Sequence, residues 1–250
     1  MINSAGARGR ARLGDTDLME AEMTICEFAS IFTQAGNPHT ISRARLLKVA
    51  AFAAGLGLGT LSCAVHAAPA SGGDTVQGLY QVLLSTMKNG RILGQSGRFT
   101  QLDPVIRRSF DIASMARLSV GPSWAGLSEA QRQQMTESFA RYISATYADR
   151  FDSYGGQRLE VTGEQPSSSG LMVRSQIIKA SGEPVKVDYM MRRNGDNWLI
   201  SDIYLDGAIS EVATRRSEFS TILKNEGIDG LIAALNRKAD LLTGTSARAS

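Results

Sequence analysis

The sequence predicts an α+β domain, in which helices lie on one side of a curved antiparallel sheet of about four strands. Two observations lead to this prediction. Residues 183–205 have the alternating pattern of two strands joined by a tight turn, and the segments on either side of them carry apolar residues at helical spacing. Helices and strands are thus segregated along the chain, which is typical of the α+β class.

Three helices are predicted at the start of this domain. Each combines an apolar stripe with a capping aspartate or an early proline at its start. They cover residues 74–88, 99–110 and 111–120. The residues from 94 to 97 are expected to form a loop, and Gly121-Pro122 is expected to stop the third helix.

The longest predicted helix begins after Ser128. Gln131 lies three places further on and completes a capping box with Ser128. Bulky residues then recur at steps of three and four until Gly155-Gly156: Met135, Phe139, Ile143, Tyr147, Phe151 and Tyr154. A helix of about 25 residues spans roughly 38 Å, the width of a small domain.

The first three strands of the sheet are predicted from short runs with a period of two. A short strand covers 159–161, a polar loop covers 166–170, and a second strand covers 171–179. The third strand has one apolar set of alternating residues: Val185, Val187, Tyr189 and Met191. Asp188 belongs to the opposite set, and we expect it to be solvated.

The turn after the third strand is the clearest short-range feature of the sequence. Asn194-Gly195 lies between two alternating runs, which is the strongest hairpin signal known for a short segment. The fourth strand covers 198–205. Its two-residue period puts one set of side chains on the core-facing side: Trp198, Ile200, Asp202 and Tyr204.

Two helices are predicted after the sheet. The first begins at Ser210 and ends at Gly227, a residue that suits a helix C-terminus. The second begins near Leu231. Residues 243–250 are expected to form a flexible tail.

Residues 1–67 are interpreted as a leader. A positively charged segment at 43–48 precedes an apolar run, and Val65-His66-Ala67 offers small residues at the two positions that signal peptidase needs. This pattern predicts export to the periplasm with cleavage after Ala67. Residues 1–42 precede the signal and are attributed to a mis-assigned start codon or to an unusually long leader.

The sequence disfavours two alternatives to a cleaved signal. The apolar run at 49–65 is short and rich in glycine for a transmembrane anchor. Lipidation at Cys63 is disfavoured because Leu61 lies one place late for such a site.

Cleavage after Ala67 would leave a single domain, residues 68–242, without cysteine or histidine. All residues of these two types lie upstream: Cys26, Cys63, His39 and His66. A disulfide framework, a thiolate nucleophile, a Cys/His zinc site and an imidazole triad are thereby excluded. No cofactor is expected. The net charge of +3 comes from scattered basic residues and gives no argument for nucleic-acid binding.

Asp202 is the most interesting polar residue of the predicted sheet. A carboxylate two positions from Tyr204 could act as a general base beside an oxyanion donor. The structural interpretation is that Asp202 pairs with an arginine or accepts backbone N–H groups near the strand end. We favour the structural interpretation, because buried carboxylates generally have partners.

The remaining feature is the amount of apolar surface. Apolar faces of several helices and of a curved sheet converge in a chain with almost no catalytic side chains. Helices over a concave sheet either fill the space between them or leave an apolar cavity. The sequence pattern leaves both arrangements open.

Several short runs resemble the MlaC/toluene-tolerance family of periplasmic phospholipid carriers. In the C-terminal half they are 197–202, Asp206-Gly207, 216–219 and 227–231. In the helical half they are Phe110-Asp111, Val120-Gly121, Trp124, Ser128, Gln131, Phe139 and Tyr147. The runs 124–127 and 209–213 are most similar to HpnM, the hopanoid-biosynthesis-associated branch. The resemblance extends over roughly residues 79–242.

The resemblance implies a non-enzymatic periplasmic carrier that moves phospholipid or a hopanoid-type lipid between the outer and inner membranes. It implies two partners, an inner-membrane ABC transporter complex of the MCE type and an outer-membrane lipoprotein complex. Two alternatives stay open. One is an enzyme on a cone-shaped α+β scaffold that uses Asp202 and Tyr204, and the other is a cargo-free adaptor of a membrane transporter.

The family's acyl-chain pocket is expected between the sheet and the helices. The residues expected to line it are the apolar strand faces and the helix residues opposite them: Leu83, Met115, Phe139, Ile143, Tyr147, Val185, Val187, Tyr189, Met191, Trp198, Ile200, Phe219 and Leu223. No metal ligand is expected.

Overall fold

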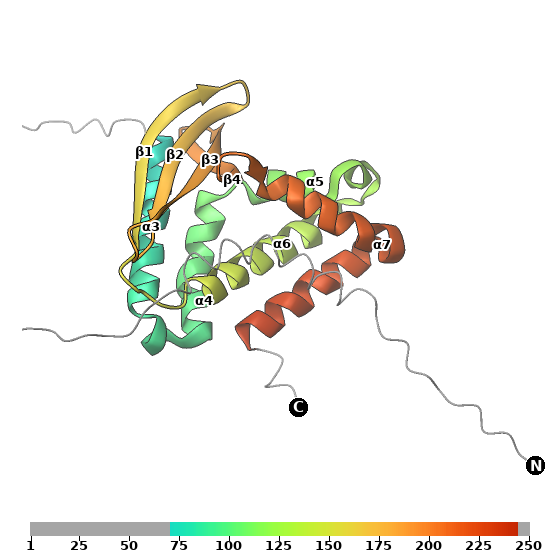
Figure 1. Cartoon of the computed structure of the whole chain (residues 1–250). Coiled ribbons are helices and arrows are strands. Elements are labelled where there is room, and N and C mark those ends of the chain that lie inside the picture. The colour runs from blue at the N-terminus through green and yellow to red at the C-terminus, as the bar shows by residue number, and fades with distance from the viewer. Residues whose placement is uncertain (1–70, 245–250) are drawn as a thin grey trace, which may run out of the picture.

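The structure is a computed structural model that describes residues 71–244 (Figure 1). The predicted leader and its cleavage site lie outside the described residues, as do residues 245–250 of the predicted tail. Within the described part the fold is α+β, as predicted. Its sheet has five antiparallel strands in the order β1-β2-β3-β4-β5, one more than expected.

The helices of the first half are α3 (Gly72–Lys88), α4 (Gly90–Ser109), α5 (Ile112–Val120) and α6 (Glu129–Arg150), with a 3-10 helix, η1 (Gly121–Gly126), before α6. Ser71 and Ser128 close capping boxes with Asp74 and Gln131. The helix expected at 99–110 is longer than predicted. It starts at Gly90 and continues through the supposed loop, with only Gly94 outside helical geometry (φ 59°, ψ −176°).

The strands are β1 (Arg158–Ser167), β2 (Gly170–Ile178), β3 (Pro184–Asn194), β4 (Asn197–Leu205) and β5 (Ile209–Ser210). The polar loop predicted at 166–170 is instead the tip of a hairpin, because Ser167 pairs with Gly170. The polar residues of this segment extend the two strands, because β1 lies at the edge of the sheet and its side chains are exposed to solvent. The predicted Asn194-Gly195 hairpin is confirmed, since Asn194 pairs with Asn197.

Asp188 of β3 is buried rather than solvated, so the prediction for this residue was wrong. Its side chain is only 5% exposed. The carboxylate is bonded to the guanidinium of Arg174 on β2, and the turn at Gly207 lies close to it. An ion pair with a neighbouring strand therefore covers a residue that the alternating pattern places on the polar face.

The last helix, α7 (Glu211–Thr243), consists of two helical segments. Gly227 separates them with a backbone conformation (φ 70°, ψ −170°) that is not helical. The predicted helix end at Gly227 is confirmed, and a second helical segment follows it, as expected. Thr243, expected in the tail, is the last residue of this helix.

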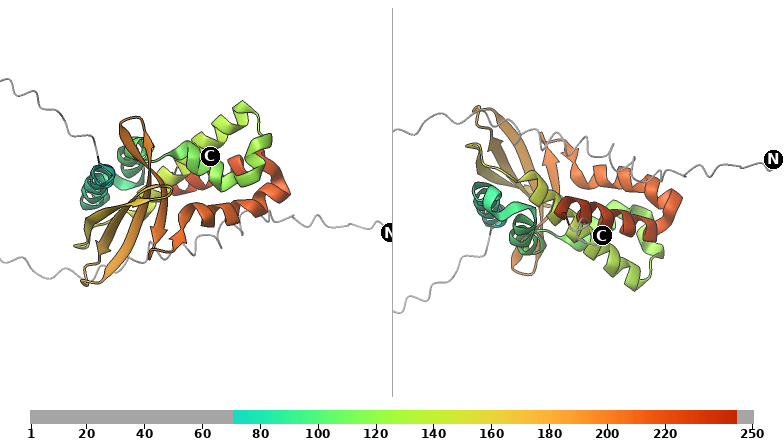
Figure 2. Two further views of the ribbon diagram at one scale, coloured as in Figure 1. Left: turned by 90° about the horizontal axis from the view of Figure 1, so that it is seen from above. Right: turned by 90° about the horizontal axis from the view of Figure 1, so that it is seen from below.

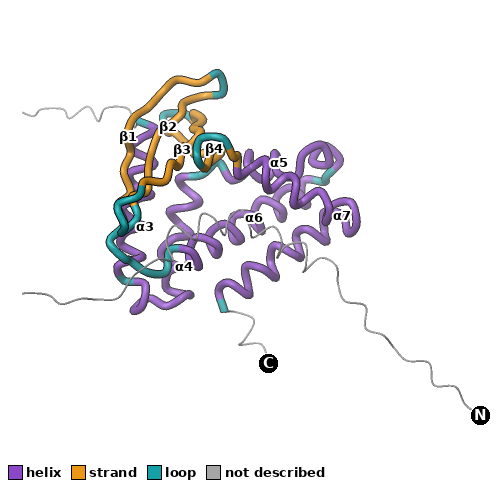
Figure 3. The backbone as a smooth tube through the Cα atoms, viewed as in Figure 1, coloured by secondary structure: helices purple, strands orange, loops and turns teal. Residues whose placement is uncertain are grey.

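The elements divide into two groups (Figure 3). Helix α3 packs against β1, β2 and β4, and α4 joins it to α6. Helices α5, α6 and α7 pack on one another and extend to one side of the sheet, away from α3 (Figure 2). The described core fills the space between these layers and includes two edge-to-face aromatic pairs, Tyr80 with Tyr189 and Phe139 with Phe219.

Candidate functional site

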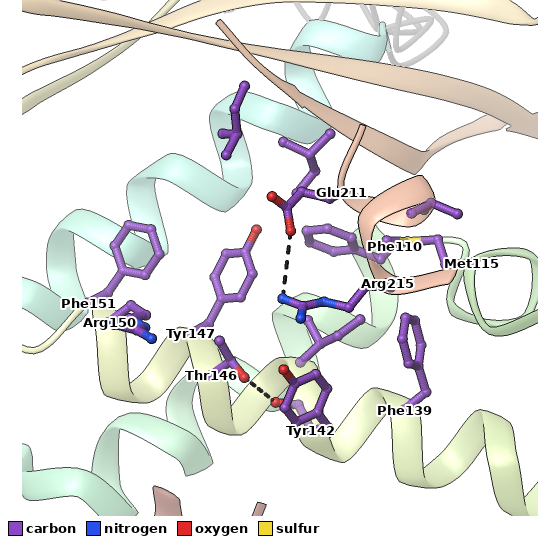
Figure 4. A pocket seen from close by; sticks show the side chains of 14 residues that line it. Phe110, Met115, Phe139, Tyr142, Thr146, Tyr147, Arg150, Phe151, Glu211 and Arg215 are labelled. Atoms are coloured by element: carbon purple, nitrogen blue, oxygen red, sulfur yellow. Dashed lines mark hydrogen bonds and ion pairs between the residues drawn. The ribbon is translucent and has the colours of Figure 1, made fainter. Parts of the chain in front are cut away.

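A cavity opens where α5, α6, the end of β4 and the start of α7 meet (Figure 4). It contains about 690 Å³ of space free of protein atoms, part of it open to solvent. Its lining is mainly apolar and aromatic: Phe110, Met115, Phe139, Tyr142, Ile143, Thr146, Tyr147, Arg150, Phe151, Ile203, Leu205, Glu211, Val212 and Arg215. The apolar and aromatic lining with a few polar groups has the character of a site for an apolar ligand.

Helix α6 supplies one long wall of the cavity. Phe139, Ile143 and Tyr147 recur at steps of four, so the helical period turns them to one face. Tyr147 stacks on Phe151, with ring centroids 5.3 Å apart, and meets Phe110 edge to face at 5.8 Å. These aromatic contacts fix the orientation of the side chains that form the wall.

The opposite wall depends on a β-bulge in β4. Met190 pairs with Asp202, whereas Met191 pairs with Ile200, so Ser201 is an extra residue in β4. Because of the extra residue, the side chains after the bulge point to the opposite face of the sheet from the one that strict alternation predicts. Buried Ile203 and Leu205 line the cavity as a result.

The same bulge takes Asp202 and Tyr204 out of the apolar set, so the prediction that they share a face with Ile200 was wrong. Neither residue lines the cavity. Asp202 accepts hydrogen bonds from the backbone N–H groups of Ile203 (2.8 Å) and Val212 (3.1 Å), and from the Ser210 hydroxyl (2.6 Å). The expectation that Asp202 accepts backbone N–H groups near the strand end is confirmed, and these bonds tie β4 to the start of α7.

Two charged residues of the lining, Glu211 and Arg215, form a cluster with Glu218 near the first turns of α7. Arg215 Nη1 lies 2.6 Å from Glu218 Oε2, and Arg215 Nη2 lies 3.7 Å from Glu211 Oε2. The guanidinium also lies over the Tyr142 ring, 5.5 Å from its centroid. Burial raises the pKa of the Glu211 carboxyl, and this effect outweighs the attraction of Arg215, which lowers the pKa. The pKa of Glu218 is raised for the same reason.

Two comparisons with known proteins bear on this geometry. The family model described as MlaC protein matches residues 77–237, well over half of the chain. The chain belongs to the MlaC family.

A solved structure has the same fold. It is the phospholipid-binding protein from Ralstonia solanacearum, determined in complex with a phospholipid. The two structures superpose with a TM-score of 0.60 at 23% sequence identity, over 69% of this chain and 99% of that one. At this level of identity the likeness establishes the fold that the two proteins share.

The structure brings together part of the set of residues predicted for the family's pocket. Met115, Phe139, Ile143 and Tyr147 line the cavity. Six others are fully buried in the packed core: Leu83, Val187, Tyr189, Met191, Ile200 and Phe219. Val185, Trp198 and Leu223 are partly buried against that core, and Trp198 borders a separate, polar hollow next to Arg107.

Sequence reasoning missed two groups of lining residues. One group comes from the end of β4 and the start of α7, and the other consists of Phe110 and of further residues on or just after α6: Tyr142, Thr146, Arg150 and Phe151. Ile203 and Leu205 reach the cavity only because of the bulge, and Glu211 and Arg215 are spaced like an ordinary surface ion pair. The aromatic repeat on α6 was the one signal in the sequence that pointed toward this cavity.

The described residues contain no group of three or more His, Cys, Asp or Glu side chains placed to hold a metal ion. Between residues 71 and 244, no helix combines the length and the apolar character needed to cross a membrane.

Proposed function

We propose that this member of the MlaC family is a non-enzymatic carrier that holds the apolar chains of a lipid in the cavity between α6, β4 and α7. The observation that carries the proposal is the cavity itself, an apolar space beside the hydrophobic core of the described residues. Each methylene group moved from water into such a space gains about 0.8 kcal/mol. The phospholipid bound to the Ralstonia solanacearum protein of the same fold supports this choice of ligand.

Arg150 gives the proposed ligand a position for its head group. This residue lines the cavity at the end of α6, and its Nε atom is buried without a hydrogen-bond partner among the described residues. A guanidinium in this state favours an anionic acceptor such as a phosphate. Chains placed along the aromatic wall would therefore leave the phosphate near Arg150.

The cellular setting belongs to the same proposal. We infer export to the periplasm, cleavage after Ala67, and transport of lipid between the outer and inner membranes. The proposed partners are an inner-membrane ABC transporter complex of the MCE type and an outer-membrane lipoprotein complex. The resemblance of 124–127 and 209–213 to the HpnM branch supports a hopanoid-type lipid as the alternative to a phospholipid cargo.

Transfer between vesicles tests the carrier function. Donor vesicles of phosphatidylethanolamine and phosphatidylglycerol would contain a self-quenching fluorescent phospholipid, and acceptor vesicles would contain none. We expect the purified full chain to relieve the quenching at a rate proportional to protein concentration. A protein that neither accelerates transfer nor takes up lipid would be an adaptor without cargo, and the proposal would be wrong.

A further inference from the structure

The charged cluster in the cavity wall is an unusual feature for a site that binds hydrocarbon chains. Glu211 is the first residue of α7 and Arg215 lies one turn later, and both line the cavity. Their side chains are 16% and 10% exposed. Figure 4 shows the Glu211 carboxylate and the Tyr147 hydroxyl directed toward the same part of the cavity.

Arg215 does not satisfy Glu211, because two carboxylates share one guanidinium. The short contact, 2.6 Å, goes to Glu218, which lies outside the lining, whereas the contact to Glu211 is 3.7 Å. The other oxygen of Glu211, Oε1, is buried and has no hydrogen-bond partner among the described residues. Arg150, the other cation of the lining, forms no ion pair with Glu211 within 4.0 Å in the described structure.

A buried acceptor without a donor destabilises any state in which it stays unpaired. A hydrocarbon chain beside Glu211 would displace water from Oε1 and supply nothing in return. A ligand group that donates a hydrogen bond would remove this penalty. Glu211 therefore discriminates between ligands that carry a donor at this depth and ligands that do not.

We propose that the cargo of this carrier presents a hydrogen-bond donor, a hydroxyl or a primary ammonium group, to Glu211 Oε1 inside the cavity. Glu211 is then a specificity-determining residue. This inference rests on the proposed function, since it assumes that the cavity holds lipid. An ionised Glu211 favours an ammonium, while a hydroxyl fits an ionised or a neutral Glu211.

Three single-chain ligands that differ only at one end test the inference on the wild-type full chain. They are hexadecanol, hexadecylammonium and hexadecyl methyl ether, and the last has no donor. Each would be titrated against a fluorescent lipid already bound to the protein. We expect at least one donor ligand to displace the reporter at about tenfold lower concentration than the ether, or lower.

Variants then assign the preference to Glu211. Glu211→Leu removes the acceptor and should bring the donor ligands within about twofold of the ether. Glu211→Gln keeps a carbonyl acceptor without the charge, so a preference for hexadecanol should survive and one for hexadecylammonium should fall. Glu137→Leu is the matched control, because Glu137 forms a surface ion pair with Arg107 on α4, outside the cavity lining. It should retain the wild-type order.

The outcomes separate this inference from the proposed function. If all three ligands bind the wild-type protein equally, the cavity holds lipid but the donor inference is wrong. If the preference persists in Glu211→Leu, Glu211 does not select the ligand and the inference is also wrong. If none of the three displaces the reporter and no lipid is taken up from vesicles, both proposals fall.

Discussion

At the scale of single residues, the cavity wall contains charged side chains where apolar side chains would be expected. Glu211 and Arg215 have the i,i+4 spacing of an ordinary surface pair, and the sequence shows nothing that turns them inward. The aromatic steps of α6 were predictable because a helical period fixes which side chains share a face. The bulge at Ser201 was missed because strict alternation was assumed along the whole strand, although the step of three from Ile200 to Ile203 breaks the two-residue period there.

The raised pKa of Glu211 predicts how stability depends on pH. Because the folded-state pKa lies above the unfolded value, the ionised carboxyl destabilises the folded protein above that pKa, and the penalty disappears as the pH falls through it. Glu211→Gln should therefore raise the melting temperature at about pH 8, and the gain should shrink toward about pH 5. Thermal melts followed by circular dichroism would measure it. A variant less stable than wild type by a constant amount at every pH would show that Glu211 mainly anchors Arg215.

At the scale of elements, most boundaries were predictable because caps and turns are local. Ser128 and Ser210 cap their helices through side-chain bonds, and Asn194-Gly195 forms its hairpin. The cap of α3 is Ser71, whereas Asp74, the predicted cap, is the third residue of that helix. Gly227 ends the first helical segment of α7, as predicted. The error was in α4, which begins at Gly90 and includes residues 95–97 of the expected loop, with Gly94 as its interruption.

The kinks at Gly94 and Gly227 require glycine for their backbone geometry. Both have positive φ with ψ near 180°, a region that costs other residues on the order of 1–3 kcal/mol, and a Cβ atom at either position would meet nothing within 4 Å. Gly227→Ala and Gly94→Ala should each lower the free energy of unfolding by about that amount. Gly78→Ala is the control. Gly78 lies in the helical interior of α3 with open space around it, so alanine should stabilise the protein by about 0.5–1 kcal/mol. Urea titrations would give all three values, and a neutral Gly227→Ala would show that the kink tolerates an ordinary residue.

At the scale of the whole molecule, the α+β class was predictable but the position of the cavity was not. Most of the predicted strand-face residues, such as Val187 and Tyr189, pack solidly against α3 and the core. The open space lies farther along, where α6 and α7 extend away from the sheet (Figure 1). The period and spacing of apolar residues identify which side chains face inward. They do not say whether the side chains of two facing elements pack together or leave a cavity.

The most direct test of lipid binding in this cavity is the amount of lipid per protein, measured by mass spectrometry of organic extracts from wild type and two tryptophan variants. Ile143 lines the cavity, so Ile143→Trp should fill it and abolish the bound lipid, while the melting temperature stays close to that of wild type. Val187 is fully buried in the core, so Val187→Trp should overpack it and destabilise the protein by about 1–3 kcal/mol or more. An Ile143→Trp protein that is folded and still carries the wild-type amount of lipid would contradict the account.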